Sequence, residues 1–360
     1  MKLNRKVAKT LGAATLLGAS GMASADVNVD FYGLFDVFAG SRETPGAADD
    51  SKVLDAGGMT TSFVGFSATA DINESTSAFV KAEMFLRPDT GDDGRYNGDE
   101  FFARAAQVGF KGDLGQIAFG RVGAPMFLPV IFSNPFGGSF VFSPAILHSF
   151  QGGNYGATVG DSGWSNGISY VSPKMGGLTA NLVYAFGEES GEDSENKFGG
   201  NLVYRAGGLM LTAAAHTAKQ GALNSGDSPG FGEGGGLAAI GGGVFSVTDQ
   251  DAYLVGASYD FQVVKVYGMY HSLDTDTTVG DVDVDTYQGG VSVPAGPGSI
   301  LASYAKSEFD GEVDAERKTW TVGYDWVIND QLDIYANYMN DDIDTLGDGD
   351  SYGVGTRLKF

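Results

Sequence analysis

Three short strings in the sequence match patterns that carry chemistry in other proteins. Residues 163–167, which read Gly-Trp-Ser-Asn-Gly, have the spacing of a nucleophile elbow, whose serine attacks an acyl carbon. Residues 230–235 have the glycine spacing that lets a backbone approach the pyrophosphate of a dinucleotide. Asp281, Asp283 and Asp285 have the spacing of the first three ligands of a calcium-binding loop. Each match counts only if the neighbouring elements fit the chemistry.

None of the three strings has the context that its chemistry needs. A nucleophile elbow joins a strand to a helix, whereas residues 163–167 leave a long loop and enter a predicted strand. Residues 230–235 have no strand before them and no helix after them, and the calcium pattern fails at Thr286 and Ser292. We therefore expect no catalytic residue, no cofactor and no metal site. An outer-membrane lipase is the enzyme alternative, suggested by Ser165 and the three histidines, His148, His216 and His271, and it would need a Ser–His pair within hydrogen-bond reach.

The N-terminus predicts export from the cytoplasm. Four basic residues occupy the first nine positions, and an apolar stretch at 11–19 precedes the small-residue site Ala23-Ser24-Ala25. The apolar stretch is too short to cross a bilayer as a helix. We expect residues 1–25 to be a signal peptide and residues 26–360 to be the mature chain.

The composition excludes several classes of function. Removing the four basic residues of the signal lowers the 22 Lys and Arg to 18, against 45 Asp and Glu, so the mature chain has a formal charge of −27. Such a chain will not bind nucleic acid electrostatically. With no cysteine, it has no disulfide framework, no thiolate catalysis and no Cys-ligated metal. Beyond the signal there is no apolar run of roughly 18 residues, and hence no predicted transmembrane helix.

Alternation of apolar and mixed side chains runs through the mature chain. In residues 27–38 one face is wholly apolar and the other holds Asp30 and Asp36, and the pattern recurs in residues 178–186, 198–206 and 352–360. A strand with lipid on one side and water on the other needs such a pattern. Strands in lipid must close into a barrel, because only closure pairs every backbone N–H and C=O.

The connections between the predicted strands alternate in length. Short turns lie at 71–74, 111–115, 173–177, 207–208, 260–262, 294–298 and 328–331, and longer polar loops lie near 40–61, 88–100, 122–165, 187–197, 218–250, 272–284, 308–316 and 341–350. Seven turns and eight loops join sixteen strands. The sequence therefore predicts an all-β, antiparallel transmembrane barrel, with short periplasmic turns and long extracellular loops. Sixteen strands leave a water-filled lumen.

Strand parity separates charged side chains from apolar ones. Lys81, Glu83 and Arg87 share one face of their segment, and the opposite face is apolar. A Lys or Arg facing the middle of the bilayer costs about 2–4 kcal/mol, so we expect the charged face to line the lumen. By the same argument four further charged residues are predicted to face the lumen, Asp30, Asp36, Arg205 and Lys265, of which Asp36, Arg205 and Lys265 are the predicted pore-lining residues.

Residues 116–121 do not fit this alternation. Ile117 and Phe119 have lipid-facing positions, and strict alternation would turn Arg121 toward lipid as well. We expect either a β-bulge at Gly120 or a position beyond the bilayer for Arg121.

Several short motifs follow one another in an order that is hard to obtain by chance. They are residues 31–36, 80–83, 119–121, Pro125, 166–173, 177–178 and 184–188, of which 166–173 is the most specific. With these motifs the chain resembles the Gram-negative general porin family over nearly its whole mature length. The resemblance implies a homotrimer in the bacterial outer membrane. Phe360 resembles the carboxy-terminal aromatic residue that the barrel-assembly machinery reads.

The same resemblance implies that loop three, residues 122–165, folds into the lumen and narrows it. From their positions, the resemblance also implies that Arg104 and Arg121 line the pore. Family members usually set acids on this loop against bases on the facing wall, and the sequence departs from that pattern. Residues 134–138 contain no acid, Asp161 is the only acid of the loop, and six phenylalanines make it apolar. We predict Phe136 and Asp161 as its constriction residues.

The acid surplus is concentrated in the predicted loops. Five of them, residues 88–100, 187–197, 272–284, 308–316 and 341–350, hold 24 of the 45 acids. One interpretation is a cation-leaning pore, because walls of one sign concentrate counter-ions at the mouth. The other is solubility, or divalent bridging to lipopolysaccharide, since at ~0.1 M salt the field fades within about 10 Å.

The sequence thus predicts an outer-membrane pore for passive diffusion of small hydrophilic solutes and ions, without enzyme activity. One alternative is a channel specific for aromatic or weakly polar compounds, suggested by the phenylalanine-rich loop three. The other is a structural or adhesion barrel whose loops bind a partner. Outer-membrane lipid and lipopolysaccharide are the expected surroundings.

Overall fold

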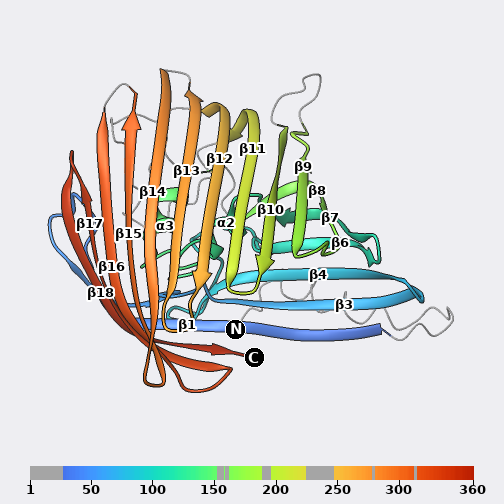
Figure 1. Cartoon of the computed structure of the whole chain (residues 1–360), viewed down its shortest axis with the longest axis horizontal. Helices are drawn as coiled ribbons and strands as arrows, with labels where there is room; N and C mark the ends of the chain where they lie inside the picture. The colour runs from blue at the N-terminus through green and yellow to red at the C-terminus, as the bar shows by residue number, and fades with distance from the viewer. Residues whose placement is uncertain are drawn as a thin grey trace, which may run out of the picture.

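The computed structural model of the chain is a closed antiparallel barrel (Figure 1). It describes residues 27–151, 158, 162–188, 196–223, 247–277, 280–311 and 314–360. The predicted signal peptide, residues 1–25, and Asp161 lie outside the described residues. In the described ranges no helix is long and apolar enough to cross a membrane.

Sixteen wall strands account for the described sheet, as predicted. Each pairs with the next along the chain, and the last pairs with the first. They are β1 (Val27–Arg42), β3 (Phe63–Asn73), β4 (Thr76–Arg87), β6 (Ala105–Gly112), β7 (Gly115–Gly123), β8 (Gly163–Val171), β9 (Leu178–Ala185), β10 (Lys197–Ala206), β11 (Leu209–Leu223), β12 (Val247–Asp260), β13 (Lys265–Thr277), β14 (Gly280–Ala295), β15 (Gly298–Asp310), β16 (Ala315–Val327), β17 (Leu332–Ile343) and β18 (Gly347–Lys359). Two short strands, β2 (Ser51–Ala56) and β5 (Asp92–Asp93), pair with the ends of β1 and β4.

The predicted alternation of faces is confirmed on the wall. On β18 Tyr352 and Val354 point outward and are exposed, whereas Gly353 and Gly355 are buried on the inner side. On β4 Val80 is exposed on the outer face and Glu83 is buried on the inner face. Because neighbouring side chains point to opposite faces of a strand, this pattern assigns the remaining residues of each strand to lipid or to lumen.

The chain terminus closes the seam between the first and last strands. Phe360 exchanges backbone hydrogen bonds with Gly33, at 3.0 and 3.1 Å between nitrogen and oxygen. Its ring stacks on Phe35 with centroids 5.8 Å apart. A Cβ on Gly33 would lie 2.7 Å from the ring of Phe360, so glycine is needed for this close approach.

Three acid-rich segments that were predicted as loops are largely strand. Residues 272–284, 308–316 and 341–350 form the upper ends of the hairpins β13–β14, β15–β16 and β17–β18. Between their acids lie inward apolar residues such as Leu273, Val284 and Phe309, which are buried. The high acid content concealed this alternation, so the strands extend farther than the sequence predicted.

The register between β7 and β8 shifts beside Gly120, but the added residue is not on β7. Gly120 pairs with Gly167 and Val122 pairs with Trp164, so the extra residue lies on β8, and Gly120 has a φ of +118°. A bulge with an added residue bends the strand locally, and glycine tolerates this backbone conformation.

Loop three, between β7 and β8, lies against the inner wall. It contains α2 (Phe127–Phe132), which packs on β11 and β12, and α3 (Pro144–Phe150), which packs on β14, β15 and β16. The Ser143 hydroxyl accepts a hydrogen bond from the Ile146 amide and caps α3, and Pro144 occupies the first turn, where no backbone donor is needed.

The hydrophobic core of the protein lies between loop three and the wall. Phe140, Ile146 and Phe150 pack with Leu254 and Leu273 of the wall in one cluster. Phe136 and Phe142 pack in a second cluster, with the wall residues Phe38, Leu301, Tyr335 and Met339. The loop fits closely, because a Cβ on the wall residue Gly353 would lie 2.5 Å from Phe38 and 3.4 Å from Phe142. Apolar burial thus holds the loop inside the barrel.

An arginine of the wall binds the C-terminal end of α3. Arg317 donates to both carboxylate oxygens of Asp341, at 2.9 and 2.7 Å, and to the carbonyls of Leu147 and Gln151, at 3.2 and 2.9 Å. The Arg317 and Asp341 side chains are both buried. The guanidinium therefore neutralises a buried acid and also binds two carbonyls at the C-terminal end of α3, of which that of Leu147 already accepts the Gln151 amide.

The buried ion pair predicts a non-additive effect on stability. Arg317→Met and Asp341→Leu should each lower the free energy of unfolding by about 3–5 kcal/mol, because each leaves a buried charge without its partner. The double variant should be less destabilised than either single variant. Urea unfolding of the barrel in lipid vesicles measures all three, and a double variant as unstable as the sum of the singles would contradict the account.

Candidate pore constriction

A buried carboxylate on the inner wall gathers three neighbours. Glu83 of β4 accepts a hydrogen bond from the Tyr32 hydroxyl at 2.7 Å, and its oxygens lie 2.9 Å from the Lys81 ammonium and 3.1 Å from Arg104 Nε. The Arg104 guanidinium also lies 4.0 Å from the centroid of the Phe63 ring. The Glu83 side chain is 4% exposed, whereas those of Lys81 and Arg104 are 37% and 27% exposed. The acid is covered and the bases keep access to solvent.

Arg87, at the upper end of the same strand, has polar partners near the mouth. It donates to the Asn97 side chain at 3.0 Å and lies 3.6 Å from the Asp92 carboxylate. Its partners come from the segment between β4 and β6. These contacts are consistent with the side-chain alternation that predicted Lys81, Glu83 and Arg87 on one face of the strand.

Two basic side chains of the lumen have aromatic neighbours rather than acids. Arg205 of β10 lies with its guanidinium 4.6 Å from the centroid of the Phe132 ring, at the end of α2. Lys265 of β13 lies with its ammonium 4.9 Å from the ring centroid of Tyr267. In the described part of the chain neither forms an ion pair. Cation–π contacts leave the positive charge of such groups available to a passing ion.

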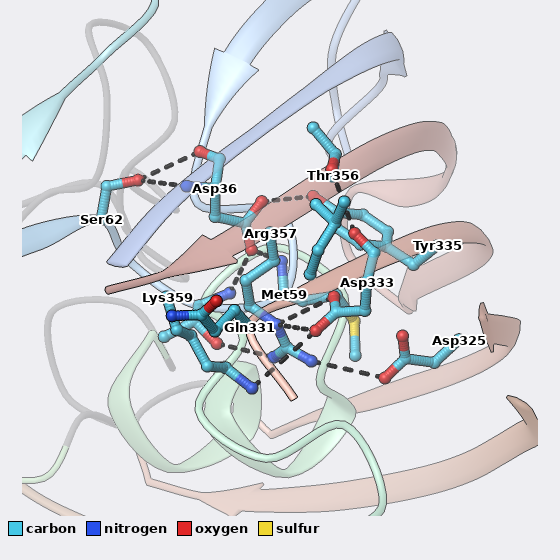
Figure 2. Close-up of polar contacts among 12 residues, drawn as sticks. Asp36, Met59, Ser62, Asp325, Gln331, Asp333, Tyr335, Thr356, Arg357 and Lys359 are labelled. Atoms are coloured by element: carbon cyan, nitrogen blue, oxygen red, sulfur yellow. Dashed lines mark hydrogen bonds and ion pairs between the residues drawn. The ribbon is translucent and has the colours of Figure 1, made fainter. Parts of the chain in front are cut away.

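Asp36 occupies the middle of β1 and is buried. Its Oδ2 accepts hydrogen bonds from the amides of Met59 and Thr60 at 2.9 and 2.8 Å, and its Oδ1 accepts one from the Tyr335 hydroxyl. Figure 2 shows Ser62 on one side of Asp36 and Tyr335 on the other. Asp36 thus binds a segment of chain rather than facing open lumen.

A second network lies below Asp36 on the last three strands (Figure 2). Arg357 donates through Nε to both oxygens of Asp333 at 3.1 Å, through Nη2 to Asp325 at 3.4 Å and through Nη1 to the Thr60 hydroxyl at 3.0 Å. The sequence placed Arg357 on the inner face but gave it no role. Arg317 and Asp341 were missed as well, because the segments around them were taken as loops.

His148 is the buried histidine of α3. Its Nδ1 lies 2.7 Å from the Ser307 hydroxyl, and its Nε2 lies 2.7 Å from the Thr319 hydroxyl. Burial lowers the pKa of His148 to about 3, so the ring is neutral at neutral pH. His148 and Ser307 are a Ser–His pair within hydrogen-bond reach, and both side chains are buried.

Ser165, the serine of the elbow-like string, has an arginine as its neighbour. Its hydroxyl accepts a hydrogen bond from Arg121 Nη1 at 3.0 Å. Arg121 also donates through Nε to the Ala103 carbonyl. Ala118 and Val122 are both buried in the inner cluster, and alternation leaves Arg121 on the face opposite to them.

Most phenylalanines of loop three pack against the barrel wall and are not exposed to the lumen. Phe136, the predicted constriction residue, is 1% exposed, and Phe142 is also buried. Leu128 is 49% exposed and is the large apolar side chain that the described part of the loop presents to solvent. Within the described residues no group of three or more His, Asp or Glu side chains is arranged to hold a metal ion. The basic residues Lys81, Arg104, Arg205 and Lys265 keep solvent-accessible surface beside this packed loop.

Comparisons with known proteins agree with this geometry. Outer membrane porin protein 32 of Delftia acidovorans is 29% identical over 355 residues, which cover 94% of this chain and 92% of that protein. The anion-selective porin from Comamonas acidovorans superposes with a TM-score of 0.76 at 22% identity, covering 93% of this chain and 100% of that chain. The trimer form of OmpT of Vibrio cholerae superposes with a TM-score of 0.65 at 17% identity, covering 93% and 99%.

The family assignment rests on a match over most of the sequence. The two superposed structures are too distant in sequence to show more than the shared fold. The family model described as Gram-negative porin, however, matches residues 12–346. With its closed sixteen-stranded barrel and an internal loop three, the chain belongs to the Gram-negative porin family.

Proposed function

We propose that the protein is a general pore for small hydrophilic solutes and ions whose constriction favours anions. As a Gram-negative porin it is an outer-membrane channel for passive diffusion. The preference for anions is supported by one observation. On the inner wall Asp36, Glu83 and Asp341 are covered by partners, whereas several bases keep exposed surface. Asp30, at the start of β1, is an exposed acid on the same face.

The buried acids contribute little to the field that a permeating ion meets. Glu83 lies between Lys81 and Arg104, Asp341 is bound by Arg317, and Asp36 has no exposed surface. A charge with an opposite partner at hydrogen-bond distance has a short-ranged field, and salt screens it further. Lys81 and Arg104 together carry one positive charge more than Glu83, and Arg205 and Lys265 add two positive charges without acidic partners in the described residues.

The acid-rich hairpin ends are the basis of the opposite, cation-leaning hypothesis. Asp274, Asp276, Asp281 and Asp283 are exposed and lie on the outer face of β13 and β14 by alternation with the inward residues Leu273 and Val284. Acids on the outer face are directed away from the lumen, which supports the anion preference. One solved structure with this fold is described as an anion-selective porin.

The alternative of a channel for aromatic or weakly polar compounds has less support. Four of the six loop-three phenylalanines, Phe136, Phe140, Phe142 and Phe150, are buried against the wall. They supply packing energy and offer no surface to a solute. The structural or adhesion alternative predicts that deleting the gene leaves solute uptake unchanged.

The proposal includes three partners. A homotrimer is supported by the trimer form of OmpT, which shares the fold. The outward acids above the apolar belt suit lipopolysaccharide contacts through divalent cations, and the exposed Phe360 at the seam suits recognition by the barrel-assembly machinery.

The sign of the selectivity can be measured directly. In a planar bilayer with a salt gradient, the reversal potential of the wild-type pore should have the sign of anion preference. The double variant Arg205→Gln/Lys265→Gln should move it toward zero, because two lumen charges without acidic partners are removed. If the reversal potential of the wild-type pore has the sign of cation preference, the proposed anion preference is refuted. The cation-leaning hypothesis, which is based on the acid-rich hairpin ends, is then supported.

A matched control removes two positive charges from the outer face. Lys306 and Lys318 lie on the outward side of β15 and β16 and pair with Glu308 and Glu316. Lys306→Gln/Lys318→Gln should leave the reversal potential close to the wild-type value. An equal shift in both double variants would mean that total charge, and not lumen charge, sets the selectivity.

Solute preference separates the general pore from the aromatic-specific one. In liposome-swelling assays an aromatic and an aliphatic neutral amino acid of similar size should enter at equal rates, once their diffusion coefficients are taken into account. Faster entry of the aromatic solute, lost in Leu128→Ala, would favour the specific channel.

A further inference from the structure

The wall strand that follows β1 is interrupted halfway along its length. β2 pairs with β1 as far as Ala56 opposite Val37, and β3 resumes at Phe63 opposite Leu34. Six residues, 57–62, therefore stand opposite only two residues of β1. Gly57 has a φ of +80°, which allows the chain to turn out of the sheet. We call residues 57–62 the inturn.

The inturn folds toward the inside of the barrel and meets loop three. The Ser139 hydroxyl of loop three donates to the Gly58 carbonyl at 2.6 Å. Met59 is 4% exposed and belongs to the same cluster as Phe136 and Phe142. The side-chain amide of Asn337, on β17, donates to the Met59 sulfur at 3.2 Å. The inturn is thus packed between the wall and the middle of loop three.

Asp36 holds the inturn at both of its ends. Its side chain accepts from the amides of Met59 and Thr60, and its own backbone bonds to Gly57 and to the Ser62 hydroxyl. Figure 2 shows these contacts converging on Asp36 from both sides, with Tyr335 completing the set. A buried carboxylate that receives three donors fixes those donors in one arrangement.

The chemistry of this contact needs a carboxylate. Two backbone N–H groups and one hydroxyl point at the oxygens, and a carboxylate offers only acceptors. Asparagine has the same shape but would present an amide N–H₂ to one set of donors. A donor facing donors leaves buried groups unpaired, which favours release of the inturn.

We propose that the inturn and loop three together form the constriction, and that Asp36 is the positioning residue that holds the inturn against loop three. Thr60 and Thr61, which are partly exposed, are the part of the inturn that borders the lumen. Arg357 of β18, the strand that pairs with β1 beside Asp36, donates to the Thr60 hydroxyl and steadies this edge. The inference rests on the proposed function only in taking the barrel to be an open pore.

Cysteine labelling tests whether Asp36 holds the inturn. The chain has no cysteine, so Met59→Cys introduces a single thiol at a buried position of the inturn. A water-soluble maleimide should modify it slowly in the folded barrel and many-fold faster when Asp36→Asn is added. Asp30→Asn, which removes the same charge from an exposed site on the same face of β1, should leave the rate unchanged. Fast labelling without Asp36→Asn, or no acceleration with it, would overturn the role of Asp36.

Single-channel recording tests whether the inturn shapes the pore. Asp36→Asn should raise the conductance and add rapid flicker, because the freed segment no longer rests on loop three. Tyr335→Phe, which removes one donor and keeps both backbone contacts, should have a smaller effect, and Asp30→Asn none. Faster labelling with unchanged conductance and noise would show that the inturn is not part of the constriction.

The two experiments distinguish this inference from the proposed function. A wild-type barrel that passes no current would refute the pore itself, and labelling would still decide whether Asp36 holds the inturn. Normal electrophoretic mobility of the unheated barrel in Asp36→Asn shows that the wall is intact. Loss of that folded form in Asp36→Asn would overturn the positioning role, because Asp36 would then support the whole barrel.

Discussion

Closure of the sheet is the constraint on which the rest of the structure depends. In lipid a backbone N–H or C=O without a partner costs several kcal/mol, so every wall strand needs two neighbours. The pairing of β18 with β1, completed by Phe360 and Gly33, removes the last free edge. A ring of sixteen strands is too wide for wall side chains to fill. The interior therefore needs a separate filling element, and loop three is that element.

The distribution of charge follows from this arrangement. Loop three packs mainly through buried phenyl and aliphatic groups, while Arg317 and Asp341 pair at the end of α3. The buried acids Asp36, Glu83 and Asp341 are paired or held by backbone amides, since an isolated buried carboxylate is costly. Many of the exposed acids lie at the outer ends of the hairpins. An acidic chain can in this way enclose a lumen in which bases keep the exposed surface.

The wall could be predicted because its strands show a local alternation of side chains. The interior could be predicted only in part, because it depends on contacts between residues far apart in the sequence. Alternation and turn residues such as Gly207-Gly208 predicted the sixteen strands, and parity placed Lys81, Glu83 and Lys265. The inturn meets a loop-three residue 81 positions away, and Arg317 meets loop-three carbonyls 170 and 166 positions away. A local pattern contains no sign of such contacts. The hairpin ends were mistaken for loops because acids on the outer face outnumbered the apolar residues between them. Arg357 lay on a face already identified, but its partners on β16 and β17 could not be known.

The glycine at position 353 has a consequence for how such a pore can change. A Cβ at this wall residue would lie 2.5 Å from the ring of Phe38, which would have to shift, and at an ordinary contact distance of 3.4 Å from Phe142 of loop three. Phe38 packs edge to face on Phe142 with ring centroids 5.5 Å apart, so a shift of Phe38 presses on loop three. The width of the opening is thus coupled to the size of the side chains on the wall behind the loop. Bore could thus be adjusted in small steps from positions that no solute ever touches.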